Sequence, residues 1–136
     1  MRYLRLRYGH FGVGVAALIQ DEQGRVLLVH RTYSHEEPWG LPGGWLEGAD
    51  SLEETVRREL REETGLAVRV RGVAAAQRAD FAVVILLRAD LEAPAGTEPT
   101  LAFRPSAEVS EVAWVQPDDA ARLSPLNAAL IRRALA

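Results

Sequence analysis

Residues 51–65 narrow what this chain can fold into more than any other segment, because they carry both the start and the stop signals of a helix. Ser51 is a favoured N-cap residue, Glu54 follows it at the spacing of a capping box, and Gly65 is a typical C-terminal stop. Between them, apolar residues recur every four positions, at Leu52, Val56 and Leu60. We therefore predict a helix over Ser51–Thr64 that buries one apolar stripe against another layer of structure.

The segments around this helix read as strands, loops and a second helix. Alternating or continuous apolar patterns predict strands over residues 11–19, 25–30, 67–77, 81–89 and 109–115. The remaining segments are expected to be a hairpin turn at 21–24, Gly- and Pro-bearing loops at 32–45 and 92–105, a short segment at 117–122 and a final helix at 125–135. Because no regular βαβ repeat is present, we expect an α/β fold of the mixed α+β kind, with a mixed β-sheet between helices. The length of 136 residues fits a single domain over 1–136.

Acidic residues are concentrated in one short part of the chain. The formal net charge is −3, and residues 47–63 alone hold seven acidic residues against three arginines. All 16 basic residues are arginine, which excludes lysine Schiff-base chemistry and a P-loop lysine. The chain has no cysteine, so disulfides, thiolate zinc sites and cysteine nucleophiles are excluded as well.

Composition also bears on location and partners. The lack of cysteine fits a reducing cytoplasm, and the apolar stretch within residues 1–19 is too short and too broken by glycine for a signal peptide. No run approaches the roughly 18 apolar residues that cross a bilayer. The only basic cluster is Arg2, Arg5 and Arg7, so binding to DNA is not expected. We expect a cytoplasmic protein without a membrane partner.

Three glutamates lie on or beside the apolar stripe of the predicted helix. At ~100° per residue from Leu52, Glu63 falls at about 20°, Glu59 at about 340° and Glu62 at about 280°. Carboxylates at these spacings repel one another, and burial at the edge of a core increases the cost. Two explanations stay open at this point: a solvated helix with ion pairs to residues such as Arg58, or a site for a hard divalent cation such as Mg²⁺.

The glycine-rich segment before the helix strengthens the second explanation. Trp39-Gly40-Leu41-Pro42-Gly43-Gly44-Trp45 can present backbone carbonyls and amides to a ligand where side chains would obstruct it. The alternative is a tight turn between a strand and the helix.

Gly44, Asp50 and the run Arg58–Leu66 together resemble the Nudix box. The family pattern is Gly, five residues, Glu, seven residues, then Arg-Glu-apolar-x-Glu-Glu-x-Gly-apolar. In this chain it spans Gly44–Leu66, which is 23 of 136 positions, and every fixed position matches except Asp50, which replaces Glu. Asp50 keeps the carboxylate and shortens it by one methylene. The order of elements around the box also resembles the αβα sandwich of this family.

The resemblance implies roles for individual residues. Glu59, Glu62 and Glu63 correspond to the metal-binding glutamates, the Gly44 carbonyl to an occasional further ligand, and Arg58 to the arginine that orients a box glutamate. Many members use another acid from a later loop, for which Glu108 is our candidate, with Glu111 behind it. Members that remove oxidised nucleotides read the base with an asparagine at the start of the last helix, where this chain has Asn127. A first-turn capping role for Asn127 is the alternative.

Three residues outside the box complete the expected site. Arg31 is a candidate contact to phosphate or base, and Trp39 and Trp45 border the expected mouth of the site, where either could stack on a base or pack in the core.

The resemblance implies a pyrophosphohydrolase that uses Mg²⁺, with Mn²⁺ as a substitute, and water as the nucleophile on a nucleoside diphosphate derivative. Glu59 or Glu108 would accept the proton. The expected partner is a small nucleotide, and the box does not separate nucleoside triphosphates from ADP-ribose, nucleotide sugars, dinucleoside polyphosphates or capped RNA. Two rivals remain: a nucleotide-binding sensor that does not hydrolyse, and an acidic interaction module. Neither the number of metal ions nor the oligomeric state follows from the sequence.

Overall fold

The computed structural model describes residues 11–92 and 103–136, which contain both strands and helices. In chain order the elements are β1 (Gly12–Leu18), β2 (Val26–Arg31), β3 (Trp39–Gly40), β4 (Gly43–Trp45), α2 (Leu52–Thr64), β5 (Val68–Ala79), β6 (Ala82–Leu91), β7 (Val109–Val115), α3 (Pro117–Arg122) and α4 (Pro125–Leu135). Over these residues, every helix is too short or too polar to cross a membrane.

The strands form two sheets. The larger has the order β4-β1-β6-β5, with β1 and β6 parallel and the other pairs antiparallel. The smaller has the antiparallel order β3-β2-β7. The turn between β1 and β2 connects them, with an isolated bridge from Gln20 to Val26. The expected mixed sheet is therefore present as the four-stranded sheet, and a second sheet accompanies it.

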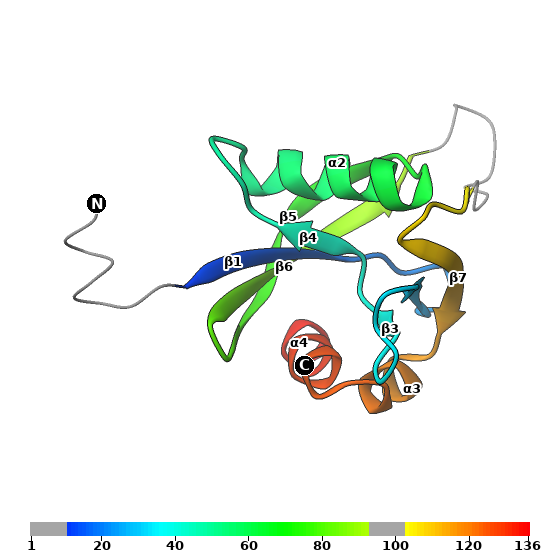
Figure 1. The fold of residues 1–136 in the computed structure, drawn as a ribbon. Helices are drawn as coiled ribbons and strands as arrows, with labels where there is room; N and C mark the ends of the chain where they lie inside the picture. The colour runs from blue at the N-terminus through cyan, green and yellow to red at the C-terminus, as the bar shows by residue number, and fades with distance from the viewer. Residues whose placement is uncertain (1–10, 93–102) are drawn as a thin grey trace.

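Helices cover both faces of the four-stranded sheet (Figure 1), and β1 contributes to both interfaces. Val15 and Ala17 belong to a buried cluster with Val56 and Leu60 of α2. Ala16 and Leu18 point the other way, as successive residues of a strand do, into a cluster that contains Leu130 and Ile131 of α4. The αβα arrangement expected from the sequence is confirmed, and we call the two sides the α2 face and the α4 face.

The predicted helix boundaries agree with the structure. Ser51 accepts a hydrogen bond from the Glu54 backbone N–H, and Gly65 ends α2 with a left-handed φ of 74°. The prediction of an uninterrupted loop over 32–45 is wrong, because the short strands β3 and β4 lie within it. They form because the glycine-rich backbone pairs with β2 and β1, which a pattern of side chains does not reveal. Most of the expected loop at 92–105 lies outside the described residues.

Candidate metal and nucleotide site

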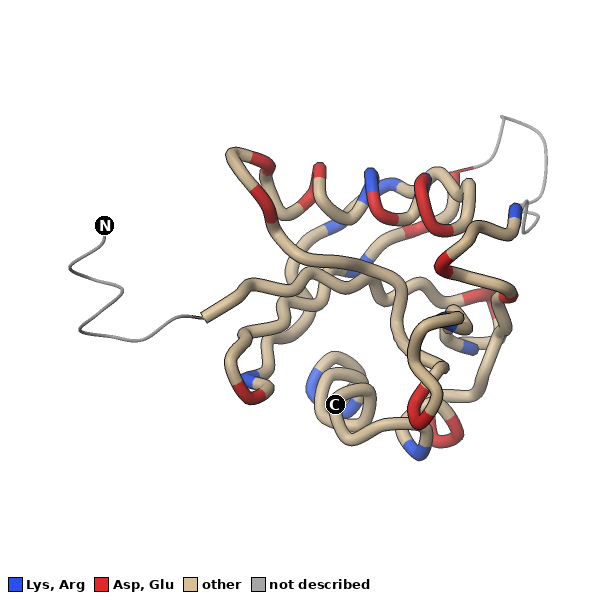
Figure 2. The backbone as a smooth tube through the Cα atoms, viewed as in Figure 1, with Lys and Arg blue, Asp and Glu red and all other residues tan. Residues whose placement is uncertain are grey.

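The three box glutamates of α2 have three different environments. Glu63 is buried, with only 5% of its surface exposed, Glu59 is half-buried, and Glu62 is exposed. Figure 2 shows acidic and basic positions following one another along this helix. The Ser51 cap and the Gly65 stop set where the helix begins and ends, and burial of the apolar stripe with Val56 and Leu60 sets which side of it meets the sheet. The burial of the three acids thus follows their predicted angles, because Glu63 and Glu59 lie closest to the apolar stripe and Glu62 lies at its flank.

Glycines in β4 allow the helix to approach the sheet edge closely. A Cβ atom at Gly44 would lie 2.5 Å from Cδ of Glu59. A Cβ atom at Gly43 would lie 2.0 Å from the Val15 carbonyl oxygen, and the φ of 155° there is one that L side chains rarely adopt. No residue with a side chain fits either position without movement. The Glu59 carboxylate is thereby held directly against the backbone of β4.

Glu63 is a buried carboxylate without a full set of partners. Its Oε2 atom accepts no hydrogen bond from any described residue, and the Nη2 atom of Arg31 lies 3.8 Å away. Burial raises the pKa of Glu63 to about 7; Arg31 opposes this shift, and Glu59 and Glu108 add to it. A buried carboxylate that is this costly to ionise has an unmet need for positive charge.

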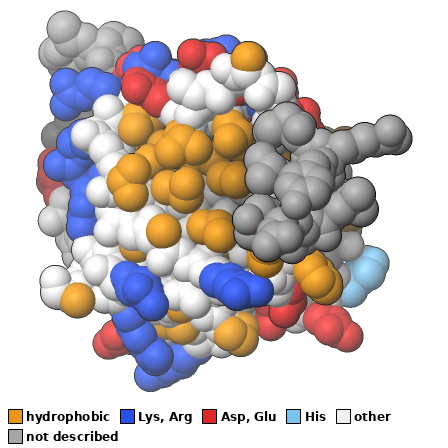
Figure 3. Space-filling model, turned by 90° about the vertical axis from the view of Figure 1, so that its left-hand side faces the viewer, with side chains coloured by type: hydrophobic (Ala, Val, Ile, Leu, Met, Phe, Trp, Pro, Cys, Tyr) orange, Lys and Arg blue, Asp and Glu red, His pale blue; other side chains and the backbone are white. Residues whose placement is uncertain are grey.

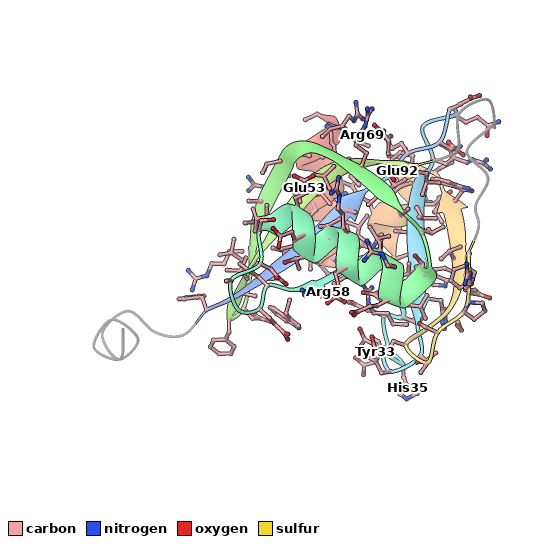
Figure 4. All side chains as sticks on the ribbon, turned by 90° about the horizontal axis from the view of Figure 1, so that it is seen from above. Tyr33, His35, Glu53, Arg58, Arg69 and Glu92 are labelled. Carbon is pink, nitrogen blue, oxygen red and sulfur yellow. The ribbon has the colours of Figure 1, made fainter. Side chains whose placement is uncertain are left out.

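Glu59 shares that environment. Burial raises the pKa of Glu59, the charge of Glu62 raises it further, and Arg58 opposes the shift. The Nη2 atom of Arg58 lies 3.7 Å from Oε1 of Glu59. Nη1 of the same guanidinium contacts the carboxylate of Asp50. The shorter acid at position 50 therefore still reaches Arg58, which projects from α2 (Figure 4) and links Asp50 to Glu59.

Arg58 and Glu62 do not pair with each other, although their spacing allows it. The ion pairs of Arg58 in the described chain are with Asp50 and Glu59. The ion-pair explanation for the glutamates thus accounts for part of Glu59 and leaves Glu62 without a partner among the residues described.

Glu108 reaches the same place from the segment that precedes β7. Its carbonyl oxygen accepts a hydrogen bond from Thr32 N–H at 2.9 Å, which ties it to the end of β2. Ser106 donates its hydroxyl to the Glu63 carbonyl at 2.9 Å, which ties the same segment to the end of α2. Sequence reasoning missed Ser106, since no motif marks a serine that closes a contact 43 residues away.

One cavity of about 580 Å³ brings most of the predicted site residues together. Its lining contains Gly44, Glu59, Glu63, Glu108, Arg31, Trp39, Trp45 and Asn127. Arg58 and Glu62 are not part of the lining. Tyr33, Glu37 and Glu47 also line the cavity and were not predicted. Tyr33 lies on the segment that follows β2, where it is labelled together with His35 in Figure 4. Among the described residues that line the cavity, five are acidic and one is basic, so a polyphosphate entering this space would need added positive charge.

Arg31 and the two tryptophans differ in how they are held. Nη2 of Arg31 donates to the Leu41 carbonyl at 2.9 Å, and its guanidinium passes so close to Gly40 that a Cβ there would lie 2.6 Å from Nη1. Trp39 is half-buried and meets the His30 ring edge-on, with centroids 4.9 Å apart. Trp45 is 57% exposed.

Asn127 lies in the first turn of α4, and its own backbone N–H donates to the Ser124 side chain that caps the helix. Ser124, and not the Asn127 side chain, caps this helix. Asn127 is 4% exposed, and its Nδ2 atom has no hydrogen-bond partner within the described parts of the chain. A buried amide donor that lines a cavity is suited to a hydrogen-bond acceptor on a ligand.

The acidic end of the cavity fits a divalent cation in its chemistry. Across residues 11–92 and 103–136 no three His, Asp or Glu side chains are already gathered at metal-binding distances. However, the free Oε2 of Glu63, the raised pKa of both Glu59 and Glu63, and the open backbone at Gly44 all favour a bound cation with oxygen ligands.

Comparison with known proteins gives a consistent result. The family model described as NUDIX domain matches residues 10–134. A MutT-like protein of Streptomyces ambofaciens is 33% identical over 107 residues, which are 79% of this chain and 65% of that protein. An ADP-ribose pyrophosphatase of Methanocaldococcus jannaschii is 33% identical over 66 residues, 48% of this chain and 39% of that protein. The chain thus spans less than two thirds of either relative.

A solved structure extends the likeness to the fold. The crystal structure of the MutT protein from Methanosarcina mazei Go1 has a TM-score of 0.65 and 27% identity, covering 93% of this chain and 91% of that one.

Proposed function

We propose that this chain, which belongs to the NUDIX family, is a Mg²⁺-dependent pyrophosphohydrolase that cleaves the diphosphate linkage of a nucleoside diphosphate derivative. Mn²⁺ is expected to substitute for Mg²⁺. Glu59, Glu62 and Glu63 are the proposed ligands, with the Gly44 carbonyl as a further one.

A single observation supports this proposal above the others. A buried carboxylate whose Oε2 atom has no hydrogen-bond partner among the described residues, Glu63, lies beside a second carboxylate that Gly44 admits to the sheet edge, and Glu108 lines the same cavity. Holding acids together in this way costs stability unless a cation is bound. An acidic interaction module would have no reason to bury them.

The proposed mechanism assigns a task to each of the chain's own groups. Bound Mg²⁺ would lower the pKa of water and stabilise charge on the phosphate oxygens. Glu59 or Glu108 accepts the proton of the attacking water, as a general base near the reacting phosphorus. Arg58, held by Asp50, orients the Glu59 carboxylate. Arg31 adds a positive charge on the side of Glu63.

The substrate is proposed to be a small nucleotide, such as a nucleoside triphosphate or a small diphosphate derivative. The printed names of the relatives, a MutT-like protein and an ADP-ribose pyrophosphatase, support this class. The buried Asn127 amide and the aromatic side chains of the cavity support contacts to a base.

A panel of nucleotides incubated with Mg²⁺, followed by identification of the products, tests the proposal. Cleavage between phosphates that stops in EDTA and returns with Mg²⁺ or Mn²⁺ is the expected result. Full activity in excess chelator contradicts the metal mechanism. Stoichiometric Mg²⁺ binding by calorimetry without any cleavage would identify the rival sensor, and no Mg²⁺ binding would identify the acidic module.

A further inference from the structure

The cavity extends around the edge of the four-stranded sheet, from the α2 face to the α4 face. Strand β4 is the edge strand, and its residues alternate between the faces. Gly44 pairs with Val15, which belongs to the α2 cluster, and it meets Glu59 of α2. Trp45 pairs with Gly14, whose neighbour in register on β6 is Val84, a residue packed against the α4 cluster. Gly44, at the acidic site, and Trp45 therefore lie on opposite faces of the sheet, although they are neighbours in sequence.

Two glycines of β1 lie beneath the Trp45 ring. A Cβ atom at Gly12 would lie 2.9 Å from Cζ3, 3.2 Å from Cε3 and 3.7 Å from Cη2 of Trp45, and a Cβ at Gly14 would lie 3.9 Å from Cζ3. The six-membered ring of the indole thus covers strand backbone where side chains would otherwise stand. Glycine is unfavourable inside a strand and often marks a close approach of another group. Here that group is the indole.

The remaining surface of this indole is open. Trp45 is 57% exposed and lines the cavity. Trp39, in contrast, is half-buried, contacts the His30 ring and packs against the α4 cluster, which makes it a part of the core. The end of the molecule seen in Figure 3 carries a group of hydrophobic side chains. A large flat aromatic surface left exposed beside a cavity is suited to stacking against a planar ligand group.

We propose that Trp45, supported by Gly12 and Gly14, is a stacking platform that selects substrates with a planar aromatic group; this inference rests on the proposed function. This group would bind on the α4 face, while the diphosphate lies at the acidic site of the α2 face. Asn127 lines the same cavity from α4 and supplies a buried hydrogen-bond donor. Trp45 is thus a specificity-determining residue, and the diphosphate chemistry does not need it.

The structural alternative is that Trp45 only covers two glycines of a strand, as aromatic residues across from glycine often do. The two explanations differ in ligand binding. The platform requires the aromatic ring to contact the base, whereas a covering role affects only stability.

The test is calorimetric titration in EDTA with two probes, a nucleoside 5′-monophosphate and ribose 5-phosphate, which lacks the base. The four common monophosphates are used in turn, because stacking tolerates every base. Wild-type protein should bind the monophosphates more tightly than ribose 5-phosphate. Trp45→Leu should weaken monophosphate binding about tenfold or more and leave ribose 5-phosphate unchanged, and Trp45→Phe should fall between.

Two further variants separate a loss of stacking from a general effect of substitution. Phe81→Leu removes another exposed aromatic, 81% exposed and outside the cavity lining, and should change neither probe. Gly12→Ala keeps the indole but displaces it, so it should reproduce the loss seen in Trp45→Leu. Trp45→Leu with unaltered monophosphate binding and a lower melting temperature overturns the platform, as does a wild type that does not distinguish the two probes.

These titrations do not require hydrolysis, so the two proposals fail separately. A Trp45-dependent preference for monophosphates in a protein that cleaves nothing would refute the hydrolase and retain the platform. Nucleotide cleavage with an unchanged KM in Trp45→Leu would refute only the platform.

Discussion

The α2 face and the α4 face of the four-stranded sheet share strands β1 and β4 but differ in charge. On the α2 face, Gly44 meets Glu59, and Glu63 is buried nearby. On the α4 face, Trp45, Gly14 and Val84 form an uncharged row across three strands. Because side chains alternate along a strand, one step along β4 separates an acidic region from an apolar one. We infer that chemistry and substrate selection can be disturbed independently, and the following predictions test that separation.

The largest effect is expected at Glu63. Glu63→Gln keeps the size of the side chain and removes the charge of a proposed metal ligand, so kcat should fall a hundredfold or more, about 3 kcal/mol at roughly 1.4 kcal/mol per decade. Steady-state kinetics measures this, and circular dichroism should be unchanged. Glu53→Gln, at an exposed position in the first turn of the same helix, is the matched control and should retain activity. A Glu63→Gln variant within about threefold of wild type would show that the ligand is misassigned.

Metal binding should stabilise variants of the two faces differently. Wild type and Trp45→Leu should both gain about 2.7 kcal/mol in unfolding free energy when free Mg²⁺ is a hundred times its dissociation constant, because the α4 face does not touch the ion. Glu63→Gln should gain clearly less. Thermal melts in EDTA and in millimolar Mg²⁺ measure the difference. An unchanged wild-type melting temperature on addition of Mg²⁺ would contradict the metal site, and a Trp45→Leu variant that gains nothing would show that the faces are coupled.

The stability of the metal-free protein should depend on pH through Glu63. Its pKa is raised from 4.5 to about 7 in the folded state, so the folded protein binds this proton more tightly than the unfolded chain does. The resulting stability is fully present below pH 4.5 and is lost as pH rises to about 7. The loss should be on the order of 2 kcal/mol relative to Glu63→Gln, which has no proton to release. Denaturant unfolding of both proteins in EDTA across this range measures it, and parallel stability curves would contradict the burial of an ionisable Glu63.

The smallest effect is expected at Glu62, the residue before Glu63. Glu62 is exposed and its charge raises the pKa of Glu59, so Glu62→Gln removes a repulsion and should leave the unfolding free energy in EDTA unchanged or raise it by roughly 0.5–1 kcal/mol. The same melts measure this. A clear destabilisation in EDTA would instead indicate that Glu62 has a cationic partner, as the solvated-helix explanation requires.

Local signals in the sequence were sufficient to predict the long helices and strands. Ser51 and Gly65 bound α2 as predicted, and the strand Val109–Val115 and the helix Pro125–Leu135 have the predicted limits. Capping and periodicity act within a few residues, so a single sequence contains them. The short strands β3 and β4 escaped prediction because their partners lie elsewhere in the chain.

The candidate site was likewise predictable from the sequence only in part. The spacing of Glu59, Glu62 and Glu63 predicted a cluster of carboxylates from sequence alone, and the resemblance to the Nudix box added the prediction that the backbone of Gly44 lies beside it. Only the tertiary structure decided that Arg58 pairs with Asp50, that Glu108 lines the same cavity as Glu59 and Glu63, and that Trp45 lies over Gly12 on the face opposite to Glu59. Motif spacing is a local property of the chain, whereas burial, charge pairing and the face that a side chain occupies depend on strands and loops that meet from distant positions.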